Sequence, residues 1–183
     1  MARAAQALFV ISLASTLLSC GSPVEQAGVE PVSQPVPPTA VSLRMTDIEG
    51  YRETLARHRG KVVLVDFWAT WCAPCLAQFP HTVELHRKYQ DGGLAVISVS
   101  LDDPSEAAHV REFLQEQEAD FDNLLSEYGG GTEAVDAFGL PGSVPYYRVY
   151  GRAGELRHEF GVDAQAERQF TPADIEAAVT ELL

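Results

Sequence analysis

The sequence predicts an α/β fold in which helices flank a central mixed β-sheet. Two near-continuous apolar runs at 61–67 and 94–101, rich in β-branched residues, are typical of strands covered on both faces. Segments with helical spacing and capping residues precede, separate and follow them. A turn at 151–154 between two short alternating runs indicates a hairpin near the C-terminus. The predicted order is β-α-β-α-β-α-β-β-α.

Composition limits what this fold can do. The chain has 183 residues, 46% of them apolar, which is enough for one domain of ordinary size. Its formal charge of −13 argues against nucleic acid as a partner and against attraction to an anionic lipid surface. The triple glycine at 129–131 has no Lys-Ser/Thr after it, so it is interpreted as a flexible turn rather than a phosphate loop. Nothing in the sequence indicates a cofactor or a metal.

The first 19 residues indicate an export signal. Arg3 precedes an uncharged run at 7–18 that is short for a membrane span. The run ends in Leu-Leu-Ser-Cys at 17–20, which resembles the lipobox of bacterial lipoproteins. That resemblance implies a signal peptide at 1–19 and lipidation of Cys20, which would attach the chain to a bilayer. The alternative is an ordinary signal peptide followed by an unrelated cysteine.

Residues 20–40 are predicted to form a tether. Five prolines interleave with Gln, Ser, Val and Glu, without helical or strand periodicity. Fully extended, 20 residues at ~3.1 Å each would reach roughly 60 Å. Such a tether suits a partner in or near the membrane.

The folded part is predicted to span 41–183, and its first half alternates clearly. An edge strand at 41–45 leads to a helix that Thr46 or Asp47 caps and that runs toward Gly60. The buried strand at 61–67 follows, and then a helix from about 73 to 89 that a glycine pair at 92–93 ends.

The second half begins with the buried strand at 94–101. Pro104 opens the next helix, which continues to about residue 118. The hairpin strands are placed at 146–150 and 155–160, and Thr171 with Pro172 opens a final amphipathic helix.

The chemistry concentrates at the start of the helix after the first buried strand. Cys72 and Cys75 are three residues apart there, close enough to form a small disulfide. The first thiolate lies near unpaired backbone N–H groups and the positive end of the helix dipole, which lowers its pKa. We therefore expect Cys72 to act as the nucleophile and Cys75 as the resolving thiol. Pro74 falls in the first helical turn, where a proline is tolerated.

Three other interpretations compete with a redox pair. A structural zinc site needs four ligands, and only His81 and His86 lie nearby without a second Cys-x-x-Cys. A purely structural disulfide usually closes a longer loop. A peroxidatic site resembling that of peroxiredoxins would have Thr three residues before the cysteine, where this chain has Ala69, with Thr70 one residue later. The redox pair is favoured.

Residues 63–75, Val-Leu-Val-Asp-Phe-Trp-Ala-Thr-Trp-Cys-Ala-Pro-Cys, resemble the active-site strand and turn of the thioredoxin superfamily, and especially its membrane-tethered TlpA/ResA-type reductases. The resemblance extends from about 41 to the C-terminus and implies a thioredoxin-like fold. Pro80 matches the family proline that kinks the active-site helix. The segment 101–125 matches the extra α-β insertion of the TlpA/ResA type.

The resemblance assigns further residues. Asp66 matches the buried acid that helps deprotonate the resolving thiol; the alternative is a strand-end carboxylate bonded to local backbone. The lysine that accompanies this acid in thioredoxins aligns with Ser98, so a proton relay would run through water or Ser98. Pro145 matches the cis-proline opposite the two cysteines, and the backbone of Val144 would pair with an extended substrate.

The substrate-binding set predicted in this way also includes residues beside the cysteines. Trp71, Ala73 and Pro74 are expected to contact a partner protein, together with Val144 and Pro145.

These observations predict a monomeric, lipid-anchored thiol:disulfide oxidoreductase of the bacterial envelope, facing the periplasm or the outer surface. Its expected partners are disulfides or dithiols of exported proteins, and the family implies a membrane-embedded thiol electron donor and a role in cytochrome c maturation. The alternative is a peptide-binding or chaperone-like module without redox turnover, but such a module has no need for both cysteines.

Overall fold

The computed structural model describes residues 41–162 and 168–183. The predicted signal peptide, Cys20 and the tether lie outside these residues. The strands, in chain order, are β1 (Arg44–Thr46), β2 (Val62–Trp68), β3 (Leu94–Ser100), β4 (Asp122–Ser126), β5 (Tyr146–Tyr150) and β6 (Leu156–Gly161). The helices are α1 (Ile48–Arg57), α2 (Ala73–Tyr89), α3 (Ala107–Glu116), α4 (Thr132–Phe138) and α5 (Pro172–Leu182). Short 3₁₀ turns, η1 (Gln90–Gly92) and η2 (Pro104–Glu106), follow α2 and precede α3.

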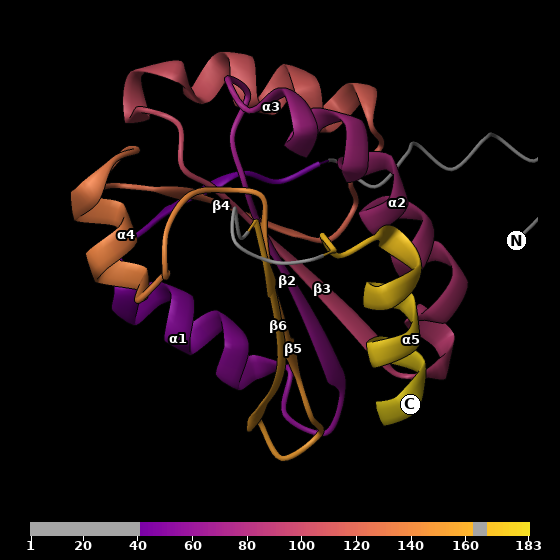
Figure 1. Cartoon of the computed structure of the whole chain (residues 1–183). Coiled ribbons are helices and arrows are strands. Elements are labelled where there is room, and N and C mark those ends of the chain that lie inside the picture. Colours follow the sequence, from indigo (N-terminus) through magenta and orange to yellow (C-terminus); the bar gives the residue numbers. More distant parts are fainter. Residues whose placement is uncertain (1–40, 163–167) are drawn as a thin grey trace, which may run out of the picture. The chain divides into compact units, whose positions relative to one another are not determined.

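The strands form one mixed sheet in the order β1-β4-β3-β2-β5-β6 (Figure 1). The first four strands of that order, β1, β4, β3 and β2, pair in parallel with their neighbours. The strand β5 pairs antiparallel with both β2 and β6. β2 and β3 lie in the middle with every residue buried, as expected for strands covered on both faces. The predicted α/β class with a mixed central sheet and flanking helices is confirmed.

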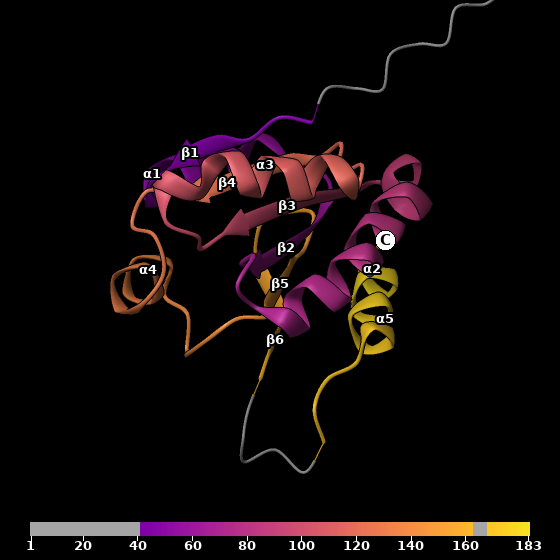
Figure 2. The same ribbon diagram turned by 90° about the horizontal axis from the view of Figure 1, so that it is seen from above.

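Helices cover both faces of the sheet, and alternate residues of β2 mark the two sides. Phe67 packs against Tyr51 of α1 and Phe138 of α4. Its neighbour Trp68 points the other way and packs against Phe79 of α2 and Phe113 of α3. In Figures 1 and 2, α1 and α4 accordingly lie on one side of the sheet and α2 and α5 on the other. None of the helices formed by the described residues is long and apolar enough to cross a bilayer.

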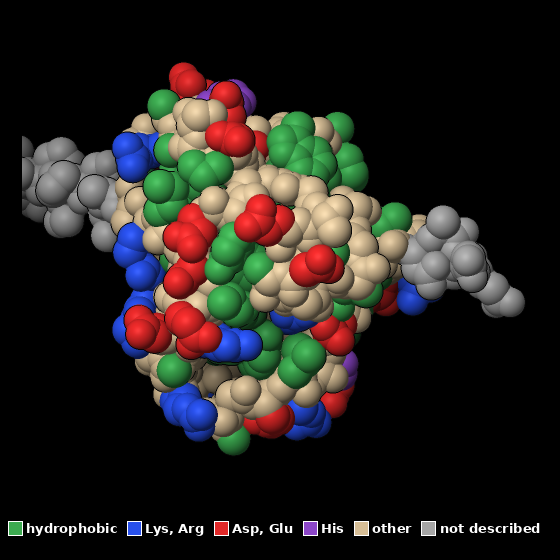
Figure 3. All heavy atoms as spheres, turned by 90° about the vertical axis from the view of Figure 1, so that its left-hand side faces the viewer, with side chains coloured by type: hydrophobic (Ala, Val, Ile, Leu, Met, Phe, Trp, Pro, Cys, Tyr) green, Lys and Arg blue, Asp and Glu red, His purple; other side chains and the backbone are tan. Residues whose placement is uncertain are grey.

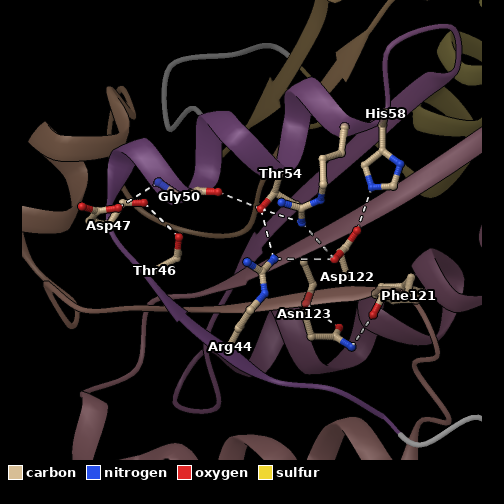
Figure 4. A network of polar contacts seen from close by, with 11 residues as sticks. Arg44, Thr46, Asp47, Gly50, Thr54, His58, Phe121, Asp122 and Asn123 are labelled. Atoms are coloured by element: carbon tan, nitrogen blue, oxygen red, sulfur yellow. Dashed lines mark hydrogen bonds and ion pairs between the residues drawn. The ribbon is translucent and has the colours of Figure 1, made fainter.

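The first strand and helix are joined to β4 by a polar network (Figure 4). Asp122, at the start of β4, accepts a hydrogen bond from His58 (Nε2 to Oδ2, 2.7 Å) and pairs with Arg44 and Arg57 at 3.7 and 3.6 Å. His58, Arg57 and Arg44 keep the pKa of the Asp122 carboxyl below its usual range. The side chain of Asp47 caps α1 by accepting from the Gly50 amide at 2.8 Å. Asp47, rather than Thr46, is therefore the N-cap.

The element order matches the prediction except between β3 and the hairpin. The strand β4 follows α3, which confirms an α-β element within 101–125, and β4 lies between β1 and β3. The helix α4 was not predicted, because the sequence pattern indicated only a flexible turn at the three glycines before it. The helix predicted to run from 104 to about 118 is divided into η2 and α3 and ends at Glu116.

Candidate redox site

The two cysteines lie where β2 ends and α2 begins. Cys72 is the N-cap of α2, and its sulfur accepts a hydrogen bond from the Cys75 amide at 3.3 Å. The two residues form a disulfide and are 5% and 2% exposed. The sulfur of Cys72 thus takes the place of the oxygen that usually caps a helix, next to the first unpaired amides and the positive end of the dipole.

The prolines around the pair fit the helix. Pro74 occupies the first turn of α2, where its missing N–H removes no helical hydrogen bond. Pro80 lies inside α2, which continues on both sides of it from Ala73 to Tyr89. The side chains of Ala73 and Pro74 are exposed, so both are accessible to a partner protein.

Asp66 lies in the middle of β2 and is 1% exposed. Burial raises the pKa of its carboxyl to about 7, although the hydroxyls of Thr82 and Tyr147 lower it in part. Thr82, on α2, donates to Oδ2 at 2.7 Å, and Tyr147 is the residue opposite Asp66 on β5. The other oxygen, Oδ1, has no hydrogen-bond partner among the residues that the structure describes. Asp66 is therefore a buried acid that can exchange a proton near neutral pH, and not a strand-end carboxylate bonded to backbone.

Of the two relays left open by the sequence, through water or through Ser98, the structure shows no hydrogen bond from the Ser98 hydroxyl to Asp66. Ser98 is the β3 neighbour of Asp66 in the register, but its hydroxyl donates to Asn123 Oδ1 at 2.8 Å. The hydroxyls that act on Asp66 belong to Thr82 and Tyr147, neither of which was predicted from the sequence. Thr82 lies seven residues after Cys75, two helical turns along the same face of α2, so helical spacing could have identified it.

The Val144–Pro145 peptide bond is cis, as the resemblance implied. Val144 is 7% exposed and lies directly before β5. Trp71, which is 62% exposed, shares a mainly apolar groove of about 330 Å³ with it. The remaining lining residues come from the end of β3, the start of α4 and the loop before Pro145: Leu101, Gly131, Thr132, Val135, Gly142 and Ser143.

Arg148 supports the loop that carries Val144. Its guanidinium donates to the carbonyls of Phe138 and Gly139, at 2.9 and 2.7 Å, and to Glu159 at 3.1 Å. The carbonyls mark the C-terminal end of α4, where the loop to Pro145 begins. Arg148 therefore ties that loop to β5. The sequence gives no signal for this role, because a buried arginine in a strand cannot be recognised before its acceptors are known.

The face formed by α1 and α4 carries exposed charges of both signs, and Arg52 and Arg57 of α1 are exposed beside its acids. Figure 3 looks onto this side, where acidic side chains lie among hydrophobic and basic ones. Exposed acids of the two helices are Glu49, Glu53, Glu133 and Asp136. Within the described part of the chain, no group of three or more His, Cys, Asp or Glu side chains could hold a metal ion.

Fold and site together define a thioredoxin-like domain with a cysteine pair at the start of its second helix. The chain belongs to the AhpC/TSA family, whose model matches residues 32–167. It is 33% identical over 100 residues to the thiol-disulfide oxidoreductase ResA of Geobacillus thermodenitrificans, an alignment that covers 51% of this chain and 56% of the relative. ResA of Halalkalibacterium halodurans is 30% identical over 133 residues, which is 72% of each chain.

A solved structure agrees with these relatives. A protein from Chlorobium tepidum, described as a thiol:disulfide interchange protein DsbE, is 30% identical with a TM-score of 0.55, over 69% of this chain and 81% of its own. The chain spans 53–56% of the length of several ResA relatives that it matches. The matches confirm the resemblance to the thioredoxin superfamily and to ResA-type proteins.

Proposed function

We propose that this protein is a thiol-disulfide oxidoreductase that works through Cys72 and Cys75. The observation that carries the proposal is the position of Cys72 as N-cap of α2, with the Cys75 amide 3.3 Å from its sulfur and the two cysteines joined in a disulfide. A sulfur in this position is stabilised as a thiolate by the amide and the helix dipole. The names of the ResA and DsbE relatives describe the same chemistry.

In the reducing direction, the reduced protein attacks a substrate disulfide. The Cys72 thiolate bonds to one substrate sulfur and expels the other as a thiolate, which gives a mixed disulfide. Cys75 then loses its proton and attacks the sulfur of Cys72, and the second substrate thiol leaves as the Cys72–Cys75 disulfide forms. Two electrons pass from the protein to the substrate. Oxidation of a dithiol is the same sequence reversed.

Asp66 is proposed as the base for Cys75. A carboxyl with a pKa of about 7 is ionised in a useful fraction at neutral pH and still binds a proton strongly enough to accept one. The Thr82 hydroxyl holds it in place from α2, and Tyr147 lies opposite it on β5. The proton would move between Cys75 and Asp66 directly or through a water molecule.

The substrate is proposed to bind across the groove beside the disulfide. Trp71 and Val144 line this groove, and the exposed Ala73 and Pro74 lie next to Cys72. An extended substrate would pair its backbone with that of Val144, as in strand addition to a sheet edge, while Pro145 presents a side chain without an N–H.

We further propose a place in the cell. Residues 1–19 would be removed as a signal peptide, lipidated Cys20 would anchor the chain and 20–40 would hold the domain 41–183 away from the membrane. The monomeric protein would reduce disulfides of exported proteins, such as apocytochrome c, in the bacterial envelope. A membrane-embedded thiol protein would resupply its electrons.

Trapping of the mixed disulfide tests this function. The reduced full chain carrying Cys20→Ser and Cys75→Ser is mixed with oxidised insulin, because the variant can attack but cannot resolve. We expect a covalent adduct through Cys72 that dithiothreitol releases. The matched variant Cys20→Ser, Cys72→Ser retains the buried Cys75 instead and should form far less adduct. Equal trapping by both variants, or none by either, would count against Cys72 as the nucleophile and favour a binding module without turnover.

A further inference from the structure

Asp102 is a buried carboxylate outside the cysteine chemistry described above. It follows β3 by two residues and is 1% exposed. Within the described part of the chain it forms no ion pair with a Lys, Arg or His side chain. A buried carboxyl group without a cationic partner needs hydrogen-bond partners, and these partners indicate what it does.

Three donors converge on Asp102, and two of them belong to Thr70. The Thr70 amide donates to Oδ2 at 3.0 Å and to Oδ1 at 3.2 Å, and the Thr70 hydroxyl donates to Oδ1 at 2.5 Å. The hydroxyl of Ser100 donates to Oδ2 at 2.6 Å. Both Thr70 donors lie in the loop between β2 and α2, 32 residues away in sequence.

That loop carries Trp71, the exposed wall of the substrate groove. A second link lies beside the first, since the Leu101 amide donates to the Trp68 carbonyl at 2.8 Å. Leu101 also lines the groove. Leu101, just after β3, therefore lines one wall of the groove. The next residue, Asp102, fixes the backbone at Thr70, immediately before Trp71 in the other wall.

Cys72 is held by different contacts. Its amide donates to the Ala69 carbonyl at 3.1 Å, and its own carbonyl accepts from the Leu76 amide at 3.1 Å within α2. Asp102 contacts neither Cys72 nor α2 by any of the hydrogen bonds above. Loss of Asp102 would release Thr70 and Trp71 and leave the cysteine pair at the start of its helix.

We infer that Asp102 is a positioning residue, which acts through Thr70 to hold Trp71 in the orientation that docks a protein substrate. This inference rests on the proposed oxidoreductase function. It predicts that loss of Asp102 changes the rate of reduction for one class of substrate and not for another. A protein disulfide that needs the groove is affected by loss of Asp102, whereas a small disulfide that meets Cys72 without using Trp71 is not.

The chain offers a matched control in the next residue. Asp103 is exposed, and its carboxylate accepts from the amide and hydroxyl of Ser105, within its own turn, at 2.9 and 2.6 Å. Asp103→Ala removes the same charge, one residue away, without touching the Thr70 loop. A difference between Asp102→Ala and Asp103→Ala therefore reports the link to Thr70 and not the change in charge.

The experiment uses the full chain with Cys20→Ser, labelled with 5-fluorotryptophan. The sequence contains two tryptophans, Trp68 and Trp71, so two ¹⁹F resonances are expected. In Asp102→Ala the Trp71 line should shift and broaden while the line of the fully buried Trp68 stays in place, which also shows that the core is folded. In Asp103→Ala neither line should move.

Kinetics on the same variants complete the test, with dithiothreitol as electron source. For Asp102→Ala, kcat/KM for insulin should fall about 10-fold to 100-fold, mainly through KM, and the rate with hydroxyethyl disulfide should stay at the wild-type value. If Asp102→Ala does not fold, Asp102→Asn and Thr70→Val take its place. In these variants kcat/KM for insulin should also fall, but by a smaller factor.

An unmoved Trp71 line, together with insulin kinetics equal to those of Asp103→Ala, would overturn the inference. A wild-type protein that reduces neither insulin nor hydroxyethyl disulfide would overturn the proposed function instead, and the two tryptophan resonances would still decide the role of Asp102.

Discussion

The substitution Asp66→Asn removes a buried carboxyl whose proton the fold retains to near neutral pH. Its pKa of about 7, against an ordinary value of 3.8, is a difference of about three units. At 1.36 kcal/mol per unit, this corresponds to about 4 kcal/mol between the protonated and ionised forms, as an upper bound. The physical cause is burial, because the carboxylate loses its water and receives only two hydroxyl neighbours in return.

The direction of the pH dependence follows from the pH at which the folded chain and the unfolded chain each lose the proton of Asp66. Below about pH 4 both the folded and the unfolded chain hold the proton of Asp66, and the full stability is present. Between about pH 4 and 7 the unfolded chain has released this proton and the folded chain keeps it, so the free energy of unfolding falls as the pH rises. Above about pH 7 both states are ionised and the loss is complete.

Urea unfolding of the oxidised chain with Cys20→Ser, from pH 4 to 8, measures how the free energy of unfolding depends on pH. The stability of wild type minus that of Asp66→Asn should decrease by up to about 4 kcal/mol across the range, because other titrating groups cancel in the difference. Asp91→Asn, which changes an exposed acid in η1, should leave the pH profile of wild type intact. A difference between wild type and Asp66→Asn that does not vary with pH would refute a raised pKa at Asp66.

Other substitutions test the parts of the structure that position the site and the anchor. Arg148→Met should lower the free energy of unfolding by about 2–4 kcal/mol, since it leaves the two carbonyls at the end of α4 without their donor and leaves Glu159 with only the Tyr146 hydroxyl of its two donors; thermal unfolding that matches wild type would contradict this role. Asp47→Ala should cost about 1 kcal/mol in urea unfolding through loss of the α1 cap, and Asp47→Asn should restore most of it. Cys20→Ser should move the protein expressed in bacteria from the membrane fraction to the soluble fraction, and unchanged retention would reject lipidation as the anchor.

The sequence predicted best what depends on local pattern. The bounds of α2 agree with the prediction at both ends, but the glycine pair predicted to end this helix lies at the end of η1, whose C-cap is Gly93. The central strands were predicted within a residue, since runs such as 62–68 are apolar on both faces. The resemblance at 63–75 added the cis bond before Pro145, which no pattern in the residues indicates.

The missed features depend on contacts between distant parts of the chain. The helix α4 has seven residues, begins after a glycine without a side-chain cap and owes its place to packing of Phe138 on Tyr51 and Phe67. Short helices without caps have little intrinsic stability, so their sequences give a weak signal.

The partners of Asp66 were missed for a related reason. The aligned position on β3, Ser98, is the neighbour of Asp66 in the register, but its hydroxyl donates to Asn123. Of the two residues that act on the carboxyl, Thr82 on α2 lies at helical spacing from Cys75, whereas Tyr147 on β5 is identified only when β5 pairs with β2.

Equilibration of the Cys20→Ser chain with glutathione buffers shows whether Cys72 and Cys75 form a reversible redox couple. The thiol content, measured by alkylation and mass, should follow a single two-electron transition that is absent from the Cys72→Ser variant. As a reductant, the protein should have a potential closer to the ~−270 mV of thioredoxin than to the ~−120 mV of strong oxidants. A potential near the upper value would contradict the reducing direction, and a thiol content that does not respond to the buffer would contradict the redox function itself.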